Sequence, residues 1–254
     1  MEMEKTSKEW TTDLSAKRIL ITGGTTGIGR EIAILLTAQG AKCLICGRNQ
    51  EQIDETITAS KTENSGGSCE GLATELANGA DIQELFKEVD TKLGGLDVLI
   101  NNAALGFGSV TEGDYDQIDY IISTNLTAYL ACTHYAIERM KNQGGGHIVN
   151  IGSMSAHVKE EGSSVYVATK SGIQGFSEAL RKEINPENIR VTLIEPGAVD
   201  TDMQPADQNE KLNQIKDQKM LPAVAIAKAV AFALTQPAGC EIVGIQIKPQ
   251  KQFI

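Results

Sequence analysis

The stretch RILITGGTTGIGREIAILL, residues 18–36, decides the fold of this chain. It opens on a short apolar run typical of a strand that is buried on both faces, and it closes on the spacing of an amphipathic helix. Glycines in the turn between them allow a sharp bend and a close approach of the backbone to a bound group, while the helix start offers N–H groups and a positive dipole end to a pyrophosphate. We therefore interpret the stretch as a dinucleotide-binding turn rather than a plain tight turn. The expected cofactor contacts are Gly23, Thr25, Thr26, Gly27, Ile28 and Gly29.

The same alternation of apolar runs and amphipathic stretches continues along the chain. Strands are predicted at residues 18–22, 42–46, 97–101, 147–151, 190–195 and 242–247, with a weaker one at 69–76. Helices are predicted at residues 29–40, 49–60, 81–93, 115–141, 164–184 and 222–236. This order predicts an α/β protein with a doubly wound Rossmann fold in three layers, in which a seven-stranded parallel sheet carries helices on both faces.

No repeat, long linker or composition break divides the sequence. Residues 17–254 are therefore expected to form one domain, preceded by a polar lead-in at 1–16 in which Trp10 is expected to dock on the body. Residues 202–221 are polar and interrupt the alternation. Because a polar insertion after a strand of such a fold is often a lid, we expect a substrate loop there.

The composition narrows the possible partners. The chain has 254 residues and a net charge of −10, which argues against nucleic acid or an anionic membrane as the main partner. No apolar run approaches the roughly 20 residues that span a bilayer, and the N-terminal residues lack the apolar core of a signal peptide. We expect a cytoplasmic protein that acts on a small molecule.

Cysteine and histidine positions do not predict a metal site. Cys43 and Cys46 form the motif C-L-I-C, but they lie in a predicted strand, where residues three apart point to opposite faces. The five cysteines have no framework spacing, and the three histidines lack the spacing of a metal-binding helix.

The end of the second predicted strand indicates which cofactor binds. NAD-binding sites usually carry an acidic residue there for the ribose 2′-hydroxyl, about twenty residues after the glycines. This chain has Arg48 and Asn49 instead. Because an arginine can bind a 2′-phosphate through charge-assisted hydrogen bonds, we predict NADP(H), with a solvated surface arginine as the alternative.

These residues, together with other short motifs, resemble the short-chain dehydrogenase/reductase family in its shorter form. The matching motifs are TGGTTGIG at 22–29, NNAA at 101–104, STNL around Asn125, IGS at 151–153, YVATK at 166–170 and PGAVDTDM at 196–203. The resemblance covers nearly all of residues 16–247 and implies four catalytic residues: Asn125, Ser153, Tyr166 and Lys170. It also implies cofactor contacts from Glu75, Leu76, Asn102, Ala103, Tyr166, Lys170, Val199 and Thr201.

Two positions depart from the family's pattern. Ala104 stands where the family usually has glycine, which narrows a loop beside the cofactor. Gly152 precedes Ser153 where the family usually has two serines, but the catalytic position remains serine, 13 residues before Tyr166. Ser155 is a less favoured candidate because it lies two residues closer to the tyrosine.

The chemistry of Tyr166 and Lys170 can be argued without the resemblance. On a helix they share one face, and this spacing alone is typical of ordinary packing. Reduction of a carbonyl needs a proton donor beside its oxygen, and a nearby ammonium lowers the pKa of a tyrosine that must also act as a base. Ser153 can polarise the substrate oxygen. The resemblance adds that Lys170 holds the nicotinamide ribose and that Asn125 holds a water relaying protons to Lys170.

Of the functional properties, the substrate is the one that the sequence indicates least clearly. The C-terminal region lacks the V-D-G-G ending of 3-oxoacyl carrier-protein reductases and is similar to the branch with serine and 3-hydroxy acid dehydrogenases. We expect a small 3-hydroxy acid or related alcohol, with a 3-oxoacyl or other ketone reductase as the alternative. Lys159 or a residue of 202–221 is the candidate that binds the carboxylate.

Two other protein classes are alternatives to an oxidoreductase of alcohols and carbonyl compounds. A catalytically silent NADP-binding sensor uses the same scaffold, but such proteins often lose the tyrosine or lysine. A nucleotide-sugar epimerase or dehydratase would need a longer chain. The family implies a homotetramer or homodimer built on helices 115–141 and 164–184.

Overall fold

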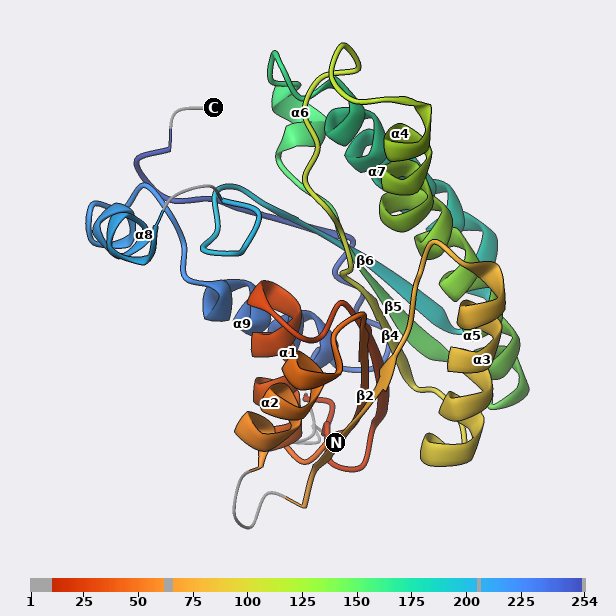
Figure 1. Ribbon diagram of the computed structural model, residues 1–254. Coiled ribbons are helices and arrows are strands. Elements are labelled where there is room, and N and C mark those ends of the chain that lie inside the picture. The colour runs from red at the N-terminus through yellow and green to blue at the C-terminus, as the bar shows by residue number, and fades with distance from the viewer. Residues whose placement is uncertain (1–10, 62–65, 205–206, 253–254) are drawn as a thin grey trace, which may run out of the picture.

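A computed structural model describes residues 11–61, 66–204 and 207–252 of the protein. Seven parallel strands form one twisted sheet in the order β3-β2-β1-β4-β5-β6-β7, with helices on both faces (Figure 1). The doubly wound fold predicted from the sequence is confirmed. The strands are β1 (Arg18–Thr22), β2 (Lys42–Gly47), β3 (Ser68–Ala73), β4 (Val98–Asn101), β5 (Gly146–Ile151), β6 (Ile189–Pro196) and β7 (Gly244–Ile247).

The helices follow the predicted positions with local differences. They are α1 (Gly27–Ala38), α2 (Gln50–Ser60), α3 (Gly79–Glu88), α4 (Tyr115–Ile122), α5 (Ala128–Asn142), α6 (Ser155–Val158), α7 (Ser164–Ile184), α8 (Gln208–Lys216) and α9 (Ala223–Leu234). Two π-helical segments, η2 (Val89–Leu93) and η3 (Ser123–Thr127), and a 3₁₀ turn, η4 (Asn185–Glu187), complete the helical part. None of the helices in the described residues is long and apolar enough to cross a membrane.

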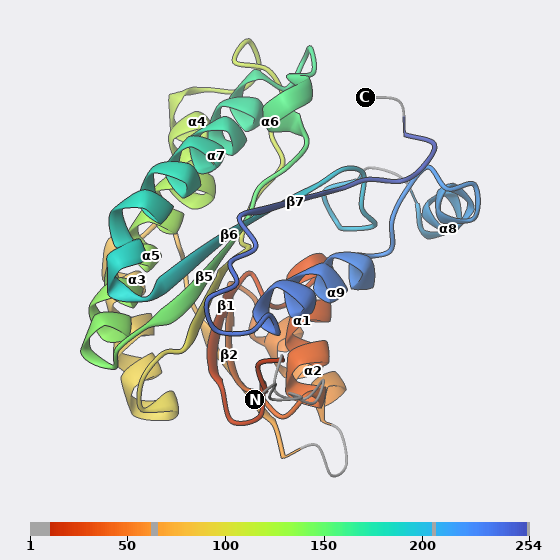
Figure 2. The ribbon, with the colours of Figure 1, turned by 180° about the vertical axis from the view of Figure 1, so that it is seen from behind.

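Alternate residues of the strands enter two hydrophobic cores, one on each face of the sheet. Ile19 and Ile21 pack with α1, α2 and α9, whereas Leu20 packs with α3, α5 and α7 on the other face, which Figure 2 shows from behind. Cys43 belongs to the first core and Cys46 to the second. The prediction that these two cysteines point to opposite faces is confirmed.

The predicted helix at 115–141 is confirmed, because α4, η3 and α5 follow one another without a break from residue 115 to residue 142. The π-helical segment η3 lies between α4 and α5 and holds Asn125, which is fully buried. Its side chain pairs with the backbone of Leu105, on a loop from a different part of the chain. Because this pairing is a tertiary contact, the local spacing of apolar residues could not predict it.

The polar segment 202–221 contains a helix as well as loop. Asp207 caps α8 by accepting a hydrogen bond from the backbone N–H of Glu210, and Lys211 donates from Nζ to the carbonyl of Thr201 at 2.7 Å. The second of these contacts attaches the helix to the segment that follows β6. The helix at 208–216 was not predicted from the sequence, and the role of the segment as a substrate loop stays a prediction.

Part of the N-terminal lead-in packs on the body. The backbone N–H of Thr12 donates to the carbonyl of Thr235, and Leu14 is buried in the first core. Trp10 lies outside the described residues, so its docking stays a prediction.

Candidate active site

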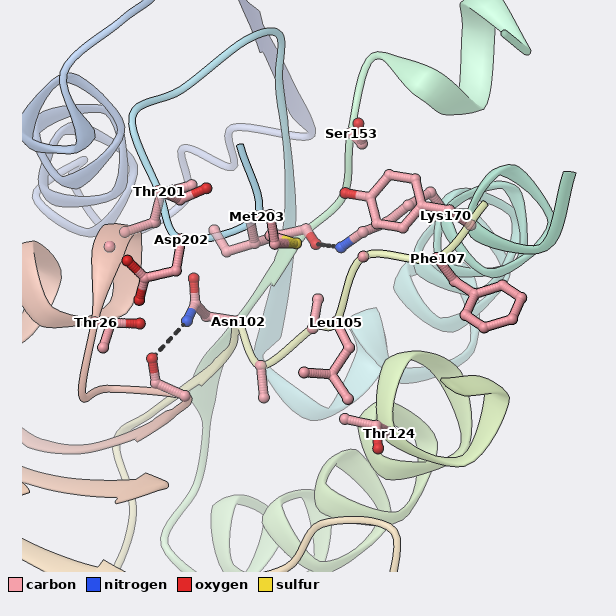
Figure 3. A pocket seen from close by; sticks show the side chains of 18 of the residues that line it. Thr26, Asn102, Leu105, Phe107, Thr124, Ser153, Lys170, Thr201, Asp202 and Met203 are labelled. Carbon is pink, nitrogen blue, oxygen red and sulfur yellow. Dashed lines mark hydrogen bonds between the residues drawn. The ribbon is translucent and has the colours of Figure 1, made fainter. Parts of the chain in front are cut away.

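A large pocket opens at the carboxyl ends of the strands. Loops that follow β1, β2, β3, β4, β5 and β6 line it, together with α4 and α7 (Figure 3). This edge is where a doubly wound sheet binds its ligands, because the loops diverge there. The pocket brings together every catalytic residue expected from the sequence except Asn125, and every expected cofactor residue except Gly29.

The glycine turn between β1 and α1 is shaped for a close ligand. A Cβ at Gly29 would overlap the carbonyl oxygen of Gly23 and approach the amide of Asn102, so only glycine fits there. Thr26, the N-cap residue of α1, makes no side-chain capping bond, and the first turn has no acidic residue. The N–H groups at the start of α1 therefore face the pocket without a competing carboxylate, which fits a pyrophosphate.

The residues after β4 brace this turn. The side-chain amide of Asn102 donates to the carbonyls of Thr22 and Gly23, both at 3.0 Å, and the N–H of Ala103 donates to Thr22 Oγ1 at 3.1 Å. A Cβ at Gly23 would lie 2.8 Å from Cα of Ala103. Asn102 and Ala103 thus line the pocket and also fix the shape of the turn.

Beside the glycine turn lie the residues expected to contact the adenosine part of the cofactor, since Gly47 at the end of β2 packs against Thr25. Arg48 donates from Nη1 to the hydroxyl of Tyr120 at 2.7 Å, and that hydroxyl donates to Glu75 Oε2 at 2.8 Å. Asn49 caps α2, since its side chain accepts from the backbone N–H groups of residues 51 and 52. Leu76 is buried and forms part of the pocket wall.

Lys170 is the buried charge beneath the catalytic end. Its Nζ donates to the carbonyl of Ile151 at 2.9 Å and lies 5.7 Å from the ring centre of Tyr166 (Figure 3). Burial lowers the pKa of Lys170 to about 7, because an ammonium surrounded by protein loses its hydration. The lysine therefore lies one helical turn from Tyr166, as its spacing indicated.

Tyr166 faces Ser153 across this end of the pocket. Burial raises the pKa of the Tyr166 phenol, a hydrogen bond with Ser153 opposes that effect, and the negative charge of Glu160 raises the pKa further. Ser155 has other partners: its hydroxyl donates to Glu160 Oε1 at 3.1 Å, and its N–H donates to Ser153 Oγ at 3.1 Å. The geometry thus favours Ser153 over Ser155 as the partner of Tyr166.

Asn125 lies apart from the pocket lining. Its Oδ1 accepts from the N–H of Leu105 and its Nδ2 donates to the carbonyl of Leu105, both at 2.8 Å. The amide thereby holds the loop that follows β4, and Leu105 itself lines the pocket. The water relay to Lys170 stays a prediction.

Val199 and Thr201 line the wall that follows β6. Val199 is buried and forms an isolated bridge with Leu221. The methyl group of Thr201 lies 3.0 Å from a Cβ placed on Gly27, so this wall touches the glycine turn. Met203 extends from the same wall toward Gly106 on the opposite loop.

Several lining residues were not found from the sequence, among them Tyr120, Phe107, Met154, Glu160 and Gln252. Phe107 and Met154 lie on the loops that follow β4 and β5, which is a general signal for a site position. Tyr120, Glu160 and Gln252 have no local pattern that marks them. Lys159, the proposed carboxylate-binding residue, is not part of the lining, and among the described lining residues the cations are Arg48 and Lys170.

Comparison with known proteins identifies relatives over almost the whole chain. A family model described as short chain dehydrogenase matches residues 17–212. An uncharacterized oxidoreductase of Staphylococcus aureus (strain MW2) is 34% identical over 239 residues, which cover 94% of this chain and 99% of that protein.

Solved structures give the same result. A short chain dehydrogenase from Burkholderia cenocepacia J2315 in complex with NADP has a TM-score of 0.83 and 29% identity, covering 94% of this chain and 98% of that one. A metagenomic short-chain oxidoreductase in complex with NADP has a TM-score of 0.80 and 26% identity, covering 94% and 99%.

Proposed function

The chain belongs to the short-chain dehydrogenase family of oxidoreductases, and from this premise we propose that it transfers hydride between NADP(H) and an alcohol or the corresponding carbonyl compound. The observation that carries the proposal is the arrangement of Tyr166 opposite Ser153 and above the buried Lys170, in a pocket that begins at the glycine turn. The choice of NADP(H) is supported by Arg48 after β2 and by the NADP complexes of two structural relatives.

The residues of the pocket have different roles in the proposed reaction. A bound nicotinamide supplies or accepts the hydride. Tyr166 donates its proton to the oxygen of the carbonyl substrate, and Ser153 donates a hydrogen bond to that oxygen and polarises it. Lys170 holds the nicotinamide ribose and, when charged, favours the deprotonated tyrosine in the reverse direction. Asn125 relays protons to Lys170 through a water.

The charges around Tyr166 bear on the substrate. Burial and the charge of Glu160 both raise the pKa of Tyr166, so the phenol is protonated before substrate binds. Arg48 donates to Tyr120, at the part of the pocket expected to hold the adenosine of the cofactor. A carboxylate substrate would therefore meet Glu160, and Lys170 would be the one described cation of the lining near it.

Of the two substrate candidates, this charge distribution favours the ketone reductase over the dehydrogenase of a small 3-hydroxy acid. An anionic group beside a carboxylate costs binding energy, whereas Leu105, Phe107, Met154 and Met203 offer apolar surface to an uncharged ketone. The similarity to the serine and 3-hydroxy acid branch remains the argument for the other candidate.

A matched pair of substrates tests this choice. Acetoacetate and acetoacetamide differ in a carboxylate and a carboxamide of nearly the same shape, and their reduction is followed by the absorbance of NADPH. We expect kcat/KM to favour the amide by about tenfold or more, and Glu160→Gln to narrow that ratio. Preference for acetoacetate that Glu160→Gln does not alter would support the hydroxy acid instead.

A silent NADP-binding sensor is the alternative from another class. Tyr166, Ser153 and Lys170 are all present and adjacent, which supports an enzyme. Absence of turnover across a panel of ketones, hydroxy acids, sugars and steroids, with NADPH binding retained, would support the sensor.

We further propose a cytoplasmic homotetramer or homodimer in which residues 17–254 act as one domain and 202–221 closes over the substrate. Ile122 and Leu130 are partly exposed apolar side chains on α4 and α5, at 39% and 41%. An interface on these helices would cover them. Light scattering after gel filtration tests the oligomer, and a monomer would contradict it.

A further inference from the structure

Three segments that are far apart in the sequence meet at the adenosine end of the pocket. Arg48 follows β2, Glu75 follows β3, and Tyr120 lies on α4 on the other side of the pocket. The hydroxyl of Tyr120 joins the other two, with an Arg48 Nη1 contact of 2.7 Å and a Glu75 Oε2 contact of 2.8 Å. The three side chains thus form a bridge from β2 to α4.

The hydrogen bonds of this bridge have a defined direction. Glu75 is fixed at one end, because its Oε1 accepts from the N–H of Ala77 at 3.0 Å. A carboxylate can only accept and a guanidinium can only donate, so the phenol must donate to Glu75 and accept from Arg48. Burial and the Glu75 hydrogen bond both raise the pKa of Tyr120, which keeps the donating proton in place.

Arg48 needs such a partner if it is to bind a phosphate well. It is exposed at the mouth of the pocket, where a long side chain samples many rotamers. Ordering it on binding costs free energy, and a residue that already holds it lowers this cost. The bond to Tyr120 uses one N–H of the guanidinium, and an arginine has five, so donors remain for an anion.

We infer that Tyr120 is a positioning residue that holds Arg48 for the 2′-phosphate and thereby sets the preference for NADP(H) over NAD(H). The inference rests on the proposed cofactor role of Arg48. Glu75 anchors the phenol, and the phenol aims the guanidinium. Tyr120 acts through Arg48 and so affects the phosphorylated cofactor selectively.

The test is a double-mutant cycle on cofactor affinity, measured by calorimetric titration of the full chain with NADPH and NADH. Tyr120→Phe keeps the ring and removes both hydrogen bonds. We expect it to weaken NADPH binding by about three- to tenfold and NADH binding by less than about twofold. In an Arg48→Met background, Tyr120→Phe should have no further effect on NADPH.

Each outcome separates the inference from its premise. If Arg48→Met weakens NADPH selectively but Tyr120→Phe leaves both affinities unchanged, the positioning role is refuted and the cofactor proposal stands. If Tyr120→Phe weakened the binding of NADPH and NADH equally, Tyr120 would have a merely structural role, and the positioning role would also be refuted. An effect that persists in the Arg48→Met background would mean direct contact rather than positioning. If Arg48→Met is not selective, the cofactor proposal itself fails.

A matched control lies on the same helix. Tyr115 is 79% exposed, so Tyr115→Phe removes a hydroxyl from α4 without touching the bridge. We expect the Tyr115→Phe variant to bind NADPH and NADH with the same affinities as the wild type. Thermal melting of each variant confirms that the fold is retained before affinities are compared.

Discussion

Replacement of Lys170 by methionine should make the protein more stable and remove a pH dependence. Lys170 is fully enclosed by protein, and burial lowers its pKa from an ordinary value of 10.5 to about 7. Methionine has a similar length and no charge to desolvate. The carbonyl of Ile151, which accepts from Lys170, also accepts from the hydroxyl of Tyr129 and so keeps a partner in the variant.

The magnitude follows from the pKa. A fall from 10.5 to about 7 corresponds to about 5 kcal/mol by which burial disfavours the charged lysine. Below about pH 7 the lysine is protonated in both states and this cost is fully present. Between about pH 7 and pH 10.5 the unfolded state binds a proton that the folded state does not, so the free energy of unfolding rises with pH. From about pH 7 to about pH 9 the gain is about 2 kcal/mol.

Urea unfolding followed by far-ultraviolet circular dichroism measures this. At about pH 7 we expect the free energy of unfolding of Lys170→Met to exceed that of the wild type by about 2–4 kcal/mol. At about pH 9 this difference should be smaller by about 2 kcal/mol. Other titrating groups affect both proteins equally and cancel in the difference. Lys182→Met, an exposed change on the same helix, should parallel the wild type. If the free energies of unfolding of Lys170→Met and the wild type changed in parallel between about pH 7 and about pH 9, the reasoning would be refuted.

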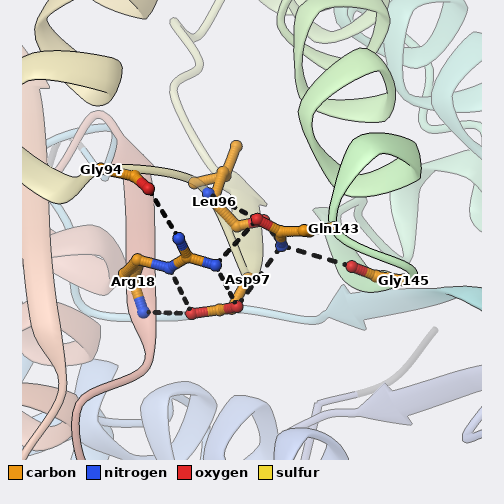
Figure 4. Close-up of polar contacts among 6 residues, drawn as sticks. All are labelled: Arg18, Gly94, Leu96, Asp97, Gln143 and Gly145. Atoms are coloured by element: carbon orange, nitrogen blue, oxygen red, sulfur yellow. Dashed lines mark hydrogen bonds and ion pairs between the residues drawn. The ribbon is translucent and has the colours of Figure 1, made fainter.

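Three further outcomes are expected. Tyr166→Phe should lower kcat by about 100- to 10,000-fold and leave NADPH affinity nearly unchanged; near-normal turnover in an absorbance assay would exclude its acid role. Gly29→Ala places a methyl group against the carbonyl of Gly23, so NADPH should no longer raise the melting temperature, and a normal increase would contradict the close-approach argument. Burial raises the pKa of Asp97, but its hydrogen bonds with Arg18 outweigh this and leave it low (Figure 4). Asp97→Asn should therefore cost about 1–3 kcal/mol in urea unfolding near neutral pH, with a difference from wild type that shrinks as the pH falls below 3.8; a constant difference would count against the ion pair.

The stability cost at Lys170 has a functional counterpart. A lysine that holds the ribose and tunes the tyrosine must lie beneath Tyr166, and this position is inside the protein. Residues placed for catalysis often reduce stability in this way.

The fold and the central part of the site were readable from the sequence because their signals are local. The apolar run before Gly23 and the helical pattern after Gly29 lie within twenty residues, and steric rules then limit the topology. Tyr166 and Lys170 share a helical face by spacing alone, so their proximity did not depend on any distant contact.

Other features depended on how distant segments pack. Asn125 pairs with the backbone of Leu105, on the loop that follows β4. No spacing of residues along the chain predicts this contact. The predicted helix runs through Asn125, but its π-helical turn there was not predicted.

The sequence by itself therefore determined the doubly wound sheet, the glycine turn, and the tyrosine–lysine pair, since each follows from residues that are neighbours along the chain. Only the tertiary structure showed that Arg48, Glu75 and Tyr120 meet, that Lys159 stays outside the pocket, and that residues 208–216 form a helix bonded to Thr201. Such contacts depend on where whole helices come to rest on the sheet, and that position is set by the packing of both cores rather than by any short stretch of sequence.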